Sequence, residues 1–93
     1  MAEDEFEWDE QKAEANLAKH AISFQIAKQA FDDPAALDRF EGHNNGEERF
    51  NVLGMVHGRL LFVVYTIRNG RKRIISARLA VRYEKRLYHE GQK

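Results

Sequence analysis

Apolar residues recur with two different spacings in the first third of the chain. Residues 5–8 alternate polar and apolar side chains, which predicts a short strand. A helix is expected over residues 10–20, because Asp9 suits the N-cap position and the charges at both ends of the segment favour the helix dipole. A second helix is expected to begin after Ser23, another N-cap residue. It should end before Pro34, which lacks an amide hydrogen and disfavours helical geometry in the preceding residue.

From residue 35 onward the spacing changes to two, the period of a β-strand. Residues 37–40 are a candidate edge strand, and residues 42–47 are expected to form a loop because of their composition. Three longer β-rich segments cover residues 49–56, 59–67 and 71–77, separated by His57-Gly58 and Asn69-Gly70. An Asn-Gly pair strongly favours a hairpin, because a type I′ turn requires positive φ at both of its central residues. The three segments are therefore predicted to pair as antiparallel strands.

The last segment, residues 79–89, has the spacing of a helix, with apolar and basic side chains on different sides. Its apolar positions are Leu79, Tyr83 and Leu87, and its basic positions are Arg82, Lys85 and Arg86. The predicted order of elements is β-α-α-β-β-β-β-α. This order indicates an α+β fold in which an antiparallel sheet is packed by two N-terminal helices and a C-terminal helix. A length of 93 residues fits a single domain, residues 1–93.

Composition removes several classes of protein. The chain has no cysteine, which excludes a disulfide framework and any Cys-based metal or redox site and fits a reducing compartment such as the cytoplasm. Its longest apolar run, residues 60–65, is far shorter than the roughly 20 residues that span a bilayer. No His-Glu-x-x-His spacing or Gly-rich phosphate loop is found in the sequence. We therefore expect a soluble cytoplasmic protein without metal, cofactor or membrane contact.

The net charge of zero conceals a strong asymmetry. Residues 1–50 carry thirteen Asp and Glu against five Lys and Arg, whereas residues 51–93 carry ten Lys and Arg against two Glu. One interpretation is a basic surface that meets phosphate or an acidic partner. The other is that the two halves pack together and their charges largely cancel. The charge count alone favours neither.

Counting residues outward from the two tight turns gives the register of the three strands. Thr66 is expected opposite both Arg49 and Arg73, with Asn51 one row along on the same face. The same count pairs Val64 with Ile75 and Phe62 with Ala77. The other face is expected to be the core beneath the two N-terminal helices, and it carries Phe50, Val52, Val63, Tyr65 and Ile74.

Two arginines beside one threonine form an unusual row. Like charges in such positions destabilise a sheet unless an anion lies between them. One possible anion is internal, either Glu48 or an N-terminal carboxylate. The other is an RNA phosphate, since an Arg guanidinium matches phosphate oxygens in a bidentate way. Structural arginine pairs are common, so the row by itself favours the internal anion.

Several short motifs, taken in this order, resemble the BrnT toxins of type II toxin–antitoxin systems. They include Phe6-Glu7-Trp8-Asp9, Lys19-His20, Glu47-Glu48-Arg49-Phe50 and Arg73-Ile74-Ile75-Ser76-Ala77-Arg78. The resemblance covers nearly the whole chain, from Phe6 to about Tyr88. Each motif is short, but their combination is specific. The resemblance implies a compact fold similar to that of the RelE ribonucleases.

The resemblance further implies a metal-independent ribonuclease toxin that inhibits translation by cleaving RNA. In such enzymes the 2′-hydroxyl of RNA attacks the adjacent phosphate, and a 2′,3′-cyclic phosphate end results. This reaction needs a base, cationic donors for the phosphorane, and an acid for the leaving oxygen. The implied partner is a BrnA-like antitoxin with a DNA-binding domain, which neutralises the toxin. The complex would repress its own promoter, so this chain would contact DNA only indirectly, through the antitoxin.

The candidate site residues come from the same resemblance, matched position by position. His20 or Glu48 is expected to be the catalytic base, and a histidine titrates near neutral pH. Arg73 and Arg78 are expected to stabilise the transition state. The residues expected to bind RNA or its phosphates are Lys19, Arg49, Arg59, Thr66 and Arg82.

A second interpretation makes the domain an interaction module without catalysis. Its basic C-terminal half would then dock an acidic or amphipathic helix of the antitoxin within an autorepressor complex. Direct DNA binding through the last helix is a third interpretation. Glu84 on that helix and the absence of a helix-turn-helix pattern argue against it.

Overall fold

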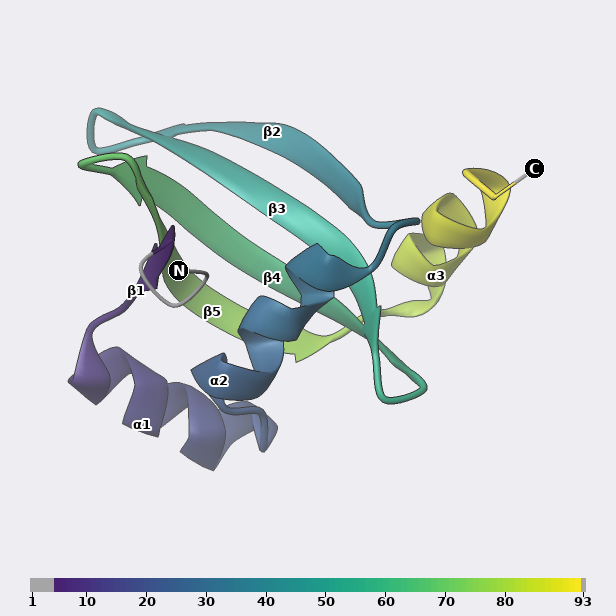
Figure 1. Cartoon of the computed structure of the whole chain (residues 1–93), viewed down its shortest axis with the longest axis horizontal. Coiled ribbons are helices and arrows are strands. Elements are labelled where there is room, and N and C mark those ends of the chain that lie inside the picture. The colour runs from purple at the N-terminus through teal and green to yellow at the C-terminus, as the bar shows by residue number, and fades with distance from the viewer. Residues whose placement is uncertain (1–4, 93) are drawn as a thin grey trace.

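The computed structural model describes residues 5–92 and confirms the predicted α+β fold (Figure 1). In chain order the elements are β1 (Phe6–Glu7), α1 (Glu10–His20), α2 (Phe24–Ala27), the 3₁₀ helix η2 (Lys28–Asp32), β2 (Leu37–Asn44), β3 (Glu47–Val56), β4 (Arg59–Arg68), β5 (Arg71–Leu79) and α3 (Arg82–Glu90). The strands form one sheet in the order β1-β5-β4-β3-β2. Within it the pair of β1 and β5 is parallel and the pairs among β2 to β5 are antiparallel.

Both predicted N-caps are confirmed. The carboxylate of Asp9 accepts a hydrogen bond from the backbone N–H of Lys12 at 3.1 Å, and the Ser23 hydroxyl accepts one from Ile26 at 3.1 Å. The second helix is α-helical only for its first turn and then tightens into η2. This helical stretch ends at Asp32, ahead of Pro34, as expected from the restriction that proline places on its neighbour.

The predicted core face is also confirmed. The predicted residues Val52, Val63, Tyr65 and Ile74 are buried against the N-terminal segment at Ile22, Phe24, Ala27 and Ala30, and Phe50 is partly buried against the same cluster. The helices α1 and α2 lie next to each other over the sheet, whereas α3 lies apart from them at the other end of the molecule (Figure 1). A smaller cluster on the opposite face joins α3 to β3 and β4 through Leu53, Leu60, Ala80 and Tyr88.

The predicted loop at residues 42–47 is wrong, because β2 continues through it to Asn44. The turn is only Asn45-Gly46, and both residues have positive φ, 53° and 81°. In the two-residue turns at His57-Gly58 and Asn69-Gly70, both residues likewise have positive φ. A bulge between Phe40 and Gly42 interrupts the pairing of β2 with β3. Residues 42–47 therefore form a third tight hairpin whose Asn-Gly signal was hidden in a polar stretch.

The predicted register of β4 and β5 holds near the turn and fails beyond it. Thr66 lies opposite Arg73, as predicted. A bulge then shifts β5 by one residue, so that Val64 faces Ser76 instead of Ile75, and Phe62 faces Arg78 instead of Ala77. A bulge inserts one extra residue and reverses the side-chain alternation that follows it. It therefore sends Ala77 into the core and Arg78 to the face that carries Arg73 and Thr66.

The C-terminal helix begins three residues later than predicted, because Leu79 is still the last residue of β5. The predicted apolar stripe holds only at Leu87, which packs against the cluster beneath α3, and is wrong for Leu79 and Tyr83, whose exposed fractions are 49% and 58%. The buried residues of α3 are Glu84 and Tyr88. Both are anchored by polar contacts to other elements, and such long-range partners leave no trace in local apolar spacing. Between residues 5 and 92, no helix is long and apolar enough to cross a membrane.

Candidate functional site

The sheet face opposite the N-terminal helices carries the predicted arginines. The cluster beneath α3 occupies one end of this face, around Leu53 and Phe62. Beyond it, alternation along β3, β4 and β5 brings polar side chains to the same face. We call this group the arginine face, and it consists of Arg49, Asn51, Thr66, Arg73 and Arg78.

Thr66 and Arg73 occupy opposite positions at the centre of the arginine face. Thr66 is almost fully buried, and its hydroxyl donates a hydrogen bond of 2.7 Å to the backbone oxygen of Glu48. The Arg73 guanidinium donates from Nη1 to Oε2 of Glu7 at 3.0 Å. The other oxygen of Glu7, Oε1, lies 3.8 Å from Nη1 of Arg71. The expected internal anion is therefore present, and it is the N-terminal carboxylate rather than Glu48.

A second carboxylate, Glu47, faces the same arginines. Its side chain accepts a hydrogen bond from Arg68. That bond, together with the positive charges of Arg68, Arg49 and Arg73, holds the pKa of Glu47 below its ordinary value. Glu48 is one residue further along β3, so alternation puts it on the opposite side of the strand from Glu47 and Arg49. The same alternation, counted back two residues from Arg49, was the signal that could have identified Glu47 from the sequence.

Two buried polar atoms beside this row have no hydrogen-bond partner in the described part of the chain. They are Nε of Arg49 and Oδ1 of Asn51, two residues apart on the same face of β3. The amide nitrogen of Asn51 is satisfied, since it donates to Oε2 of Glu41 at 3.0 Å. Glu41 is the extra residue of the β2 bulge. Unpaired buried polar atoms are uncommon in folded proteins, and they mark this end of β3 as a polar site rather than a part of the core.

Arg78 is held in a separate arrangement at the far end of the arginine face. Its two terminal nitrogens donate to the two carboxylate oxygens of Glu84, each at 2.9 Å, and Nη1 also donates to the backbone oxygen of Leu79 at 3.2 Å. The guanidinium carbon lies 4.3 Å from the centre of the Phe62 ring. Burial alone would raise the pKa of Glu84, but the hydrogen bonds from Arg78 and from the N–H of Val81 hold it below its ordinary value.

The structure brings Arg49, Thr66 and Arg73 together and sets Arg78 apart. Five residues separate Arg73 from Arg78 along β5, which corresponds to roughly 15 Å at the usual rise of a strand. A single phosphate is too small to contact both guanidinium groups. An extended RNA strand that runs along β5 would be long enough to meet both.

The remaining candidates lie at the edges of the sheet. His20 and Lys19 line a shallow cleft together with Ser76, next to the β5 bulge. Asn16 fixes α1 at this edge of β5, because its side-chain amide exchanges hydrogen bonds of 2.9 and 3.1 Å with the backbone of Ala77. Arg59 starts β4 at the end opposite Thr66, roughly 23 Å away by strand rise. Arg82 is exposed on the first turn of α3.

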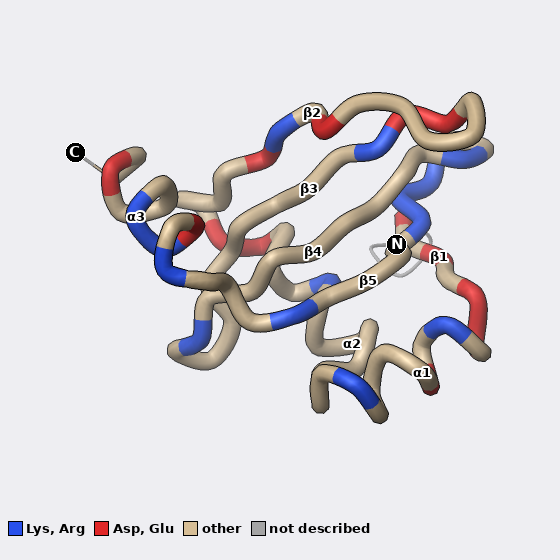
Figure 2. The backbone as a smooth tube through the Cα atoms, turned by 180° about the vertical axis from the view of Figure 1, so that it is seen from behind, with Lys and Arg blue, Asp and Glu red and all other residues tan. Residues whose placement is uncertain are grey.

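The acidic and basic halves of the chain meet around the arginine face. The ion pairs found within residues 5–92 are Arg68–Glu47, Arg71–Glu7, Arg73–Glu7 and Arg78–Glu84. Three of these four join an acid of the first half to an arginine of the second. Figure 2 shows the basic stretch around the β4–β5 turn next to the acidic residues of β1 and of the β2–β3 turn. Charge cancellation between the halves, one of the two interpretations of the sequence, is therefore present at this end of the sheet.

A comparison with protein families finds a match over residues 8–84 to the family described as the ribonuclease toxin BrnT of type II toxin–antitoxin systems. The chain belongs to the BrnT family. A comparison with curated proteins finds no match. The BrnT match includes α1, the whole of β2 to β5, and Glu84 of α3, so it contains every residue of the arginine face. The resemblance inferred from the motifs is thereby confirmed.

Membership of the BrnT family has two direct consequences. It assigns the chain to a class of ribonuclease toxins, whose substrate is RNA. It also implies a cognate antitoxin, because a type II system pairs the toxin with a protein partner.

Glu7, the carboxylate that holds Arg73, lies one residue before the BrnT match. In the described residues, 5–92, no group of three or more His, Asp and Glu side chains is arranged to hold a metal ion.

Proposed function

We propose that this chain is a metal-independent endoribonuclease that inhibits translation in the cytoplasm and is neutralised by a BrnA-like antitoxin. The observation that carries the proposal is the row of Arg49, Thr66 and Arg73, with carboxylates already held against it, inside the segment that matches the BrnT family. Guanidinium groups that bind a carboxylate in this way also suit the oxygens of a phosphate. The row therefore supplies the cationic donors that RNA cleavage requires.

The proposed reaction is a displacement at phosphorus within the RNA backbone. The 2′-oxygen forms a bond to phosphorus, the bond from phosphorus to the 5′-oxygen breaks, and a 2′,3′-cyclic phosphate is left. The proton of the 2′-hydroxyl passes to a base, and the departing 5′-oxygen takes a proton from an acid. The extra negative charge on the non-bridging oxygens is stabilised by fixed cations. Atoms and charges balance without a metal ion.

Binding of the scissile phosphate is assigned to Arg49 and Arg73, with Thr66 orienting one oxygen. The phosphate competes with Glu7 for Arg73, since both anions need the same guanidinium edge. Arg78, set apart from the row, binds the phosphate of a neighbouring nucleotide, and that phosphate competes with Glu84 for the Arg78 guanidinium. The peripheral cations Lys19, Arg59 and Arg82 serve the remainder of the RNA strand.

Two observations favour His20 over Glu48 as the base. His20 lines a cleft at the edge of the sheet with Ser76, which lies between Arg73 and Arg78 along β5, so it is beside the path proposed for the RNA strand. Glu48 belongs to the opposite side of β3 from Arg49 by alternation. A His20→Gln variant should therefore lose cleavage, whereas Glu48→Gln should retain it. The reverse result would assign the base to Glu48.

The function is tested with two oligonucleotides of one sequence, the first all-RNA and the second with DNA sugars throughout. The purified chain is expected to cleave the RNA in the presence of EDTA and to leave 2′,3′-cyclic ends, identified by mass spectrometry. It should leave the DNA intact, because the DNA lacks the attacking hydroxyl. Intact RNA, or fragments that end in a 3′-hydroxyl, would overturn the proposed reaction.

One observation favours the alternative of a non-catalytic module that binds antitoxin within an autorepressor complex. Arg68, Arg73 and Arg78 each already pair with a carboxylate, which lowers the positive charge available to RNA. Expression of the chain without antitoxin separates the two functions. A nuclease stops growth and a module leaves growth unchanged.

A further inference from the structure

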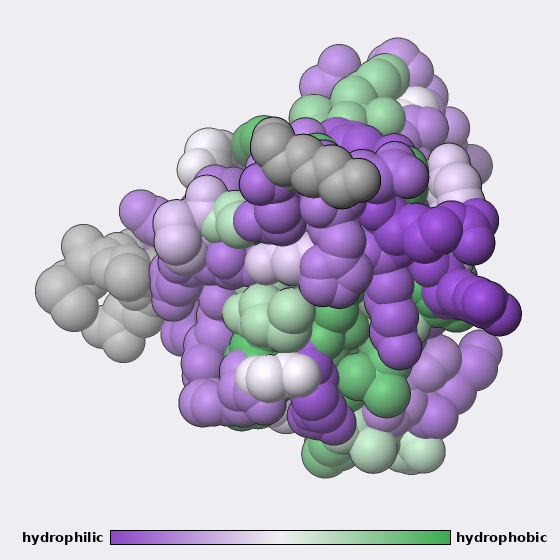
Figure 3. Space-filling model, turned by 90° about the vertical axis from the view of Figure 1, so that its right-hand side faces the viewer, coloured by the Kyte–Doolittle hydropathy of each residue, from purple (hydrophilic) through white to green (hydrophobic). Residues whose placement is uncertain are grey.

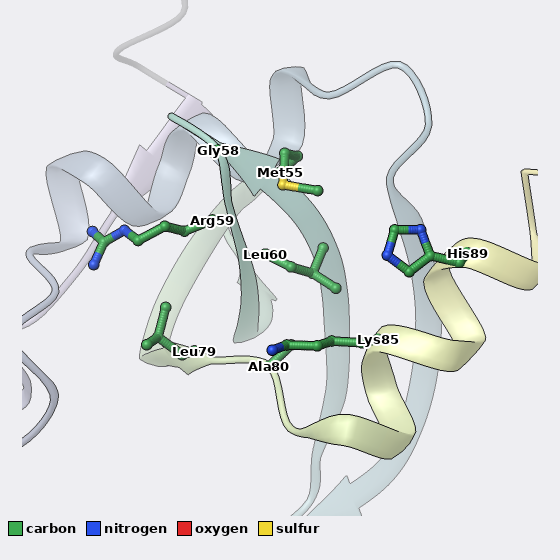
Figure 4. Close-up of a pocket in the computed structure, with 8 residues that line it drawn as sticks. All are labelled: Met55, Gly58, Arg59, Leu60, Leu79, Ala80, Lys85 and His89. Carbon is green, nitrogen blue, oxygen red and sulfur yellow. The ribbon is translucent and has the colours of Figure 1, made fainter.

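A cleft with a volume of about 400 Å³ lies between the β3–β4 turn and α3, away from the row of Arg49, Thr66 and Arg73. Its aliphatic lining consists of Met55, Leu60, Leu79 and Ala80, and its remaining lining residues are Gly58, Arg59, Lys85 and His89. Leu60 points from the sheet toward α3, and the side chains of Lys85 and His89 point from α3 into the cleft (Figure 4). The guanidinium of Arg59 extends the other way, away from α3 (Figure 4). The cleft is thus an apolar hollow with basic groups from α3 at its rim.

The basic groups at the rim are not neutralised within the described chain. Neither Arg59 nor Lys85 has a carboxylate within 4.0 Å among residues 5–92. The nearest acid along α3, Glu84, is already bound in a bidentate pair with Arg78. This contrasts with the arginine face, where Glu7 and Glu47 balance the arginines. The cleft therefore presents an uncompensated positive rim around an apolar floor.

The apolar floor continues onto the surrounding surface. Leu79 and Val81 flank Ala80, and their exposed fractions are 49% and 53%. The space-filling view of this side of the molecule shows hydrophobic side chains gathered in the middle and flanked by hydrophilic ones (Figure 3). Exposed apolar groups that adjoin a cleft and are rimmed by polar residues are typical of protein interaction sites.

We propose that this cleft is the docking site for an acidic segment of the cognate antitoxin. An apolar side chain of that segment fills the floor at Leu60 and Leu79, and a neighbouring carboxylate pairs with Lys85. The inference rests on the toxin–antitoxin assignment of the proposed function, and it adds the surface and the chemistry of the partner. Charge complementarity identifies the occupant as acidic, and the aliphatic lining identifies its anchor as a protein side chain.

RNA is a poorer occupant for this cleft. Single-stranded RNA is usually held by aromatic side chains on which its bases stack, and among the described residues that line this cleft His89 alone carries an aromatic ring. The cleft is also remote from the arginine row, since Arg59 lies roughly 23 Å from Thr66 along β4. The docking site and the cleavage site are therefore separable by mutation.

The test compares two cleft variants with two matched controls in the full-length chain. Leu79→Glu and Lys85→Glu alter the cleft. Leu17→Glu replaces a leucine of nearly the same exposure, 51%, and Lys12→Glu replaces an exposed helical lysine, both on α1. Each protein is titrated with the full-length antitoxin encoded beside it, and its RNA cleavage, thermal midpoint and mass in solution are measured separately.

Each cleft variant is expected to raise the Kd for the antitoxin at least tenfold, with RNA cleavage, thermal midpoint and mass unchanged, while both controls bind as the wild type does. Unchanged antitoxin binding by Leu79→Glu and Lys85→Glu would overturn the proposal. Loss of RNA cleavage without loss of antitoxin binding would assign the cleft to RNA instead, and loss of a dimer of the chain would assign it to a second copy. If the cleft variants lose antitoxin binding and the wild-type chain itself does not cleave RNA, the docking site is supported and the proposed nuclease activity is overturned.

Discussion

Arg73, a proposed phosphate-binding residue, donates a 3.0 Å hydrogen bond to Glu7 of the first strand. The parallel pairing of β1 with β5 sets this contact, because it places the two residues directly opposite each other. The N-terminal strand thus supplies an internal anion at the position proposed for RNA. In the proposed mechanism, substrate binding requires an exchange of one anion for another at this guanidinium.

Replacing Glu7 by glutamine removes the competing anion. The Glu7→Gln variant is expected to lower the KM for RNA about threefold to tenfold, corresponding to roughly 1 kcal/mol for a partly exposed ion pair. Steady-state cleavage kinetics measure this change, with Glu14→Gln on the exposed side of α1 as the control. An unchanged or higher KM in Glu7→Gln would show that Glu7 does not compete with RNA.

The bidentate pair of Arg78 with Glu84 requires a planar guanidinium. In Arg78→Lys the ammonium keeps the charge but loses both the second hydrogen bond and the stacking on Phe62. The free energy of unfolding is expected to fall by about 1–2 kcal/mol, measured by urea denaturation. Arg86→Lys, on the same helix as Glu84, should change it by less than about 0.5 kcal/mol. Equal effects of the two substitutions would contradict this role of Arg78.

Acid should loosen the attachment of α3. Asp33 accepts hydrogen bonds from the Tyr88 hydroxyl, Met55 N–H and Ala35 N–H at 2.5, 2.8 and 2.9 Å. Burial alone would raise the pKa of Asp33, but these bonds hold it below its ordinary value of 3.8. A carboxylate whose pKa is depressed by folding stabilises the native state above its ordinary pKa and loses that contribution as the pH falls through the folded value.

The free energy of unfolding should therefore decline below about pH 4, and Tyr88→Phe should make that decline shallower because one of the three bonds is gone. Denaturant titrations measure the free energy of unfolding of both proteins between about pH 2 and pH 6, a range that spans the ordinary carboxyl pKa. Tyr83→Phe, a change at an exposed tyrosine of the same helix, is the control. Parallel declines in Tyr88→Phe and wild type would remove Asp33 as a source of the acid sensitivity.

The close contact of η2 with β3 depends on a glycine. A Cβ atom at Gly54 would lie 2.3 Å from the backbone oxygen of Ala30, far inside contact distance, so the helix and strand would have to separate. Gly54→Ala is expected to destabilise the fold by about 3 kcal/mol or more, as overpacking of a rigid core does. Gly91→Ala, where the new methyl would lie at an ordinary 3.4 Å from Tyr88, should have little effect on the thermal midpoint. A stable Gly54→Ala protein would contradict the packing described here.

Local turn chemistry made the centre of the site predictable. The pair Asn69-Gly70 sets the register of β4 and β5, and from that register alone Thr66 lies opposite Arg73. The caps at Asp9 and Ser23 were equally local, since each depends on an N–H three residues away. These features follow from contacts within a few residues, where the sequence itself defines the geometry.

Features that depend on distant partners could not be predicted from the sequence. The bulge that moves Arg78 occurs where the amide of Asn16, from α1, binds the backbone of Ala77 across 61 positions in the chain. Both Ile75 and Ala77 are apolar, so either register satisfied the local pattern. The ion pair of Arg73 with Glu7 could not be predicted either, because it depends on the parallel pairing of the two-residue strand β1 with β5.

The catalytic efficiency of RNA cleavage tests the central claim most directly. The value of kcat/KM is measured for wild type, Arg73→Ala and the control Arg86→Ala, with the thermal midpoint of each protein taken in parallel. The account predicts that Arg73→Ala loses about 100-fold in kcat/KM, as loss of one fixed donor to a transition-state oxyanion does, while Arg86→Ala keeps the activity of the wild type. Equal cleavage by a folded Arg73→Ala protein would contradict it.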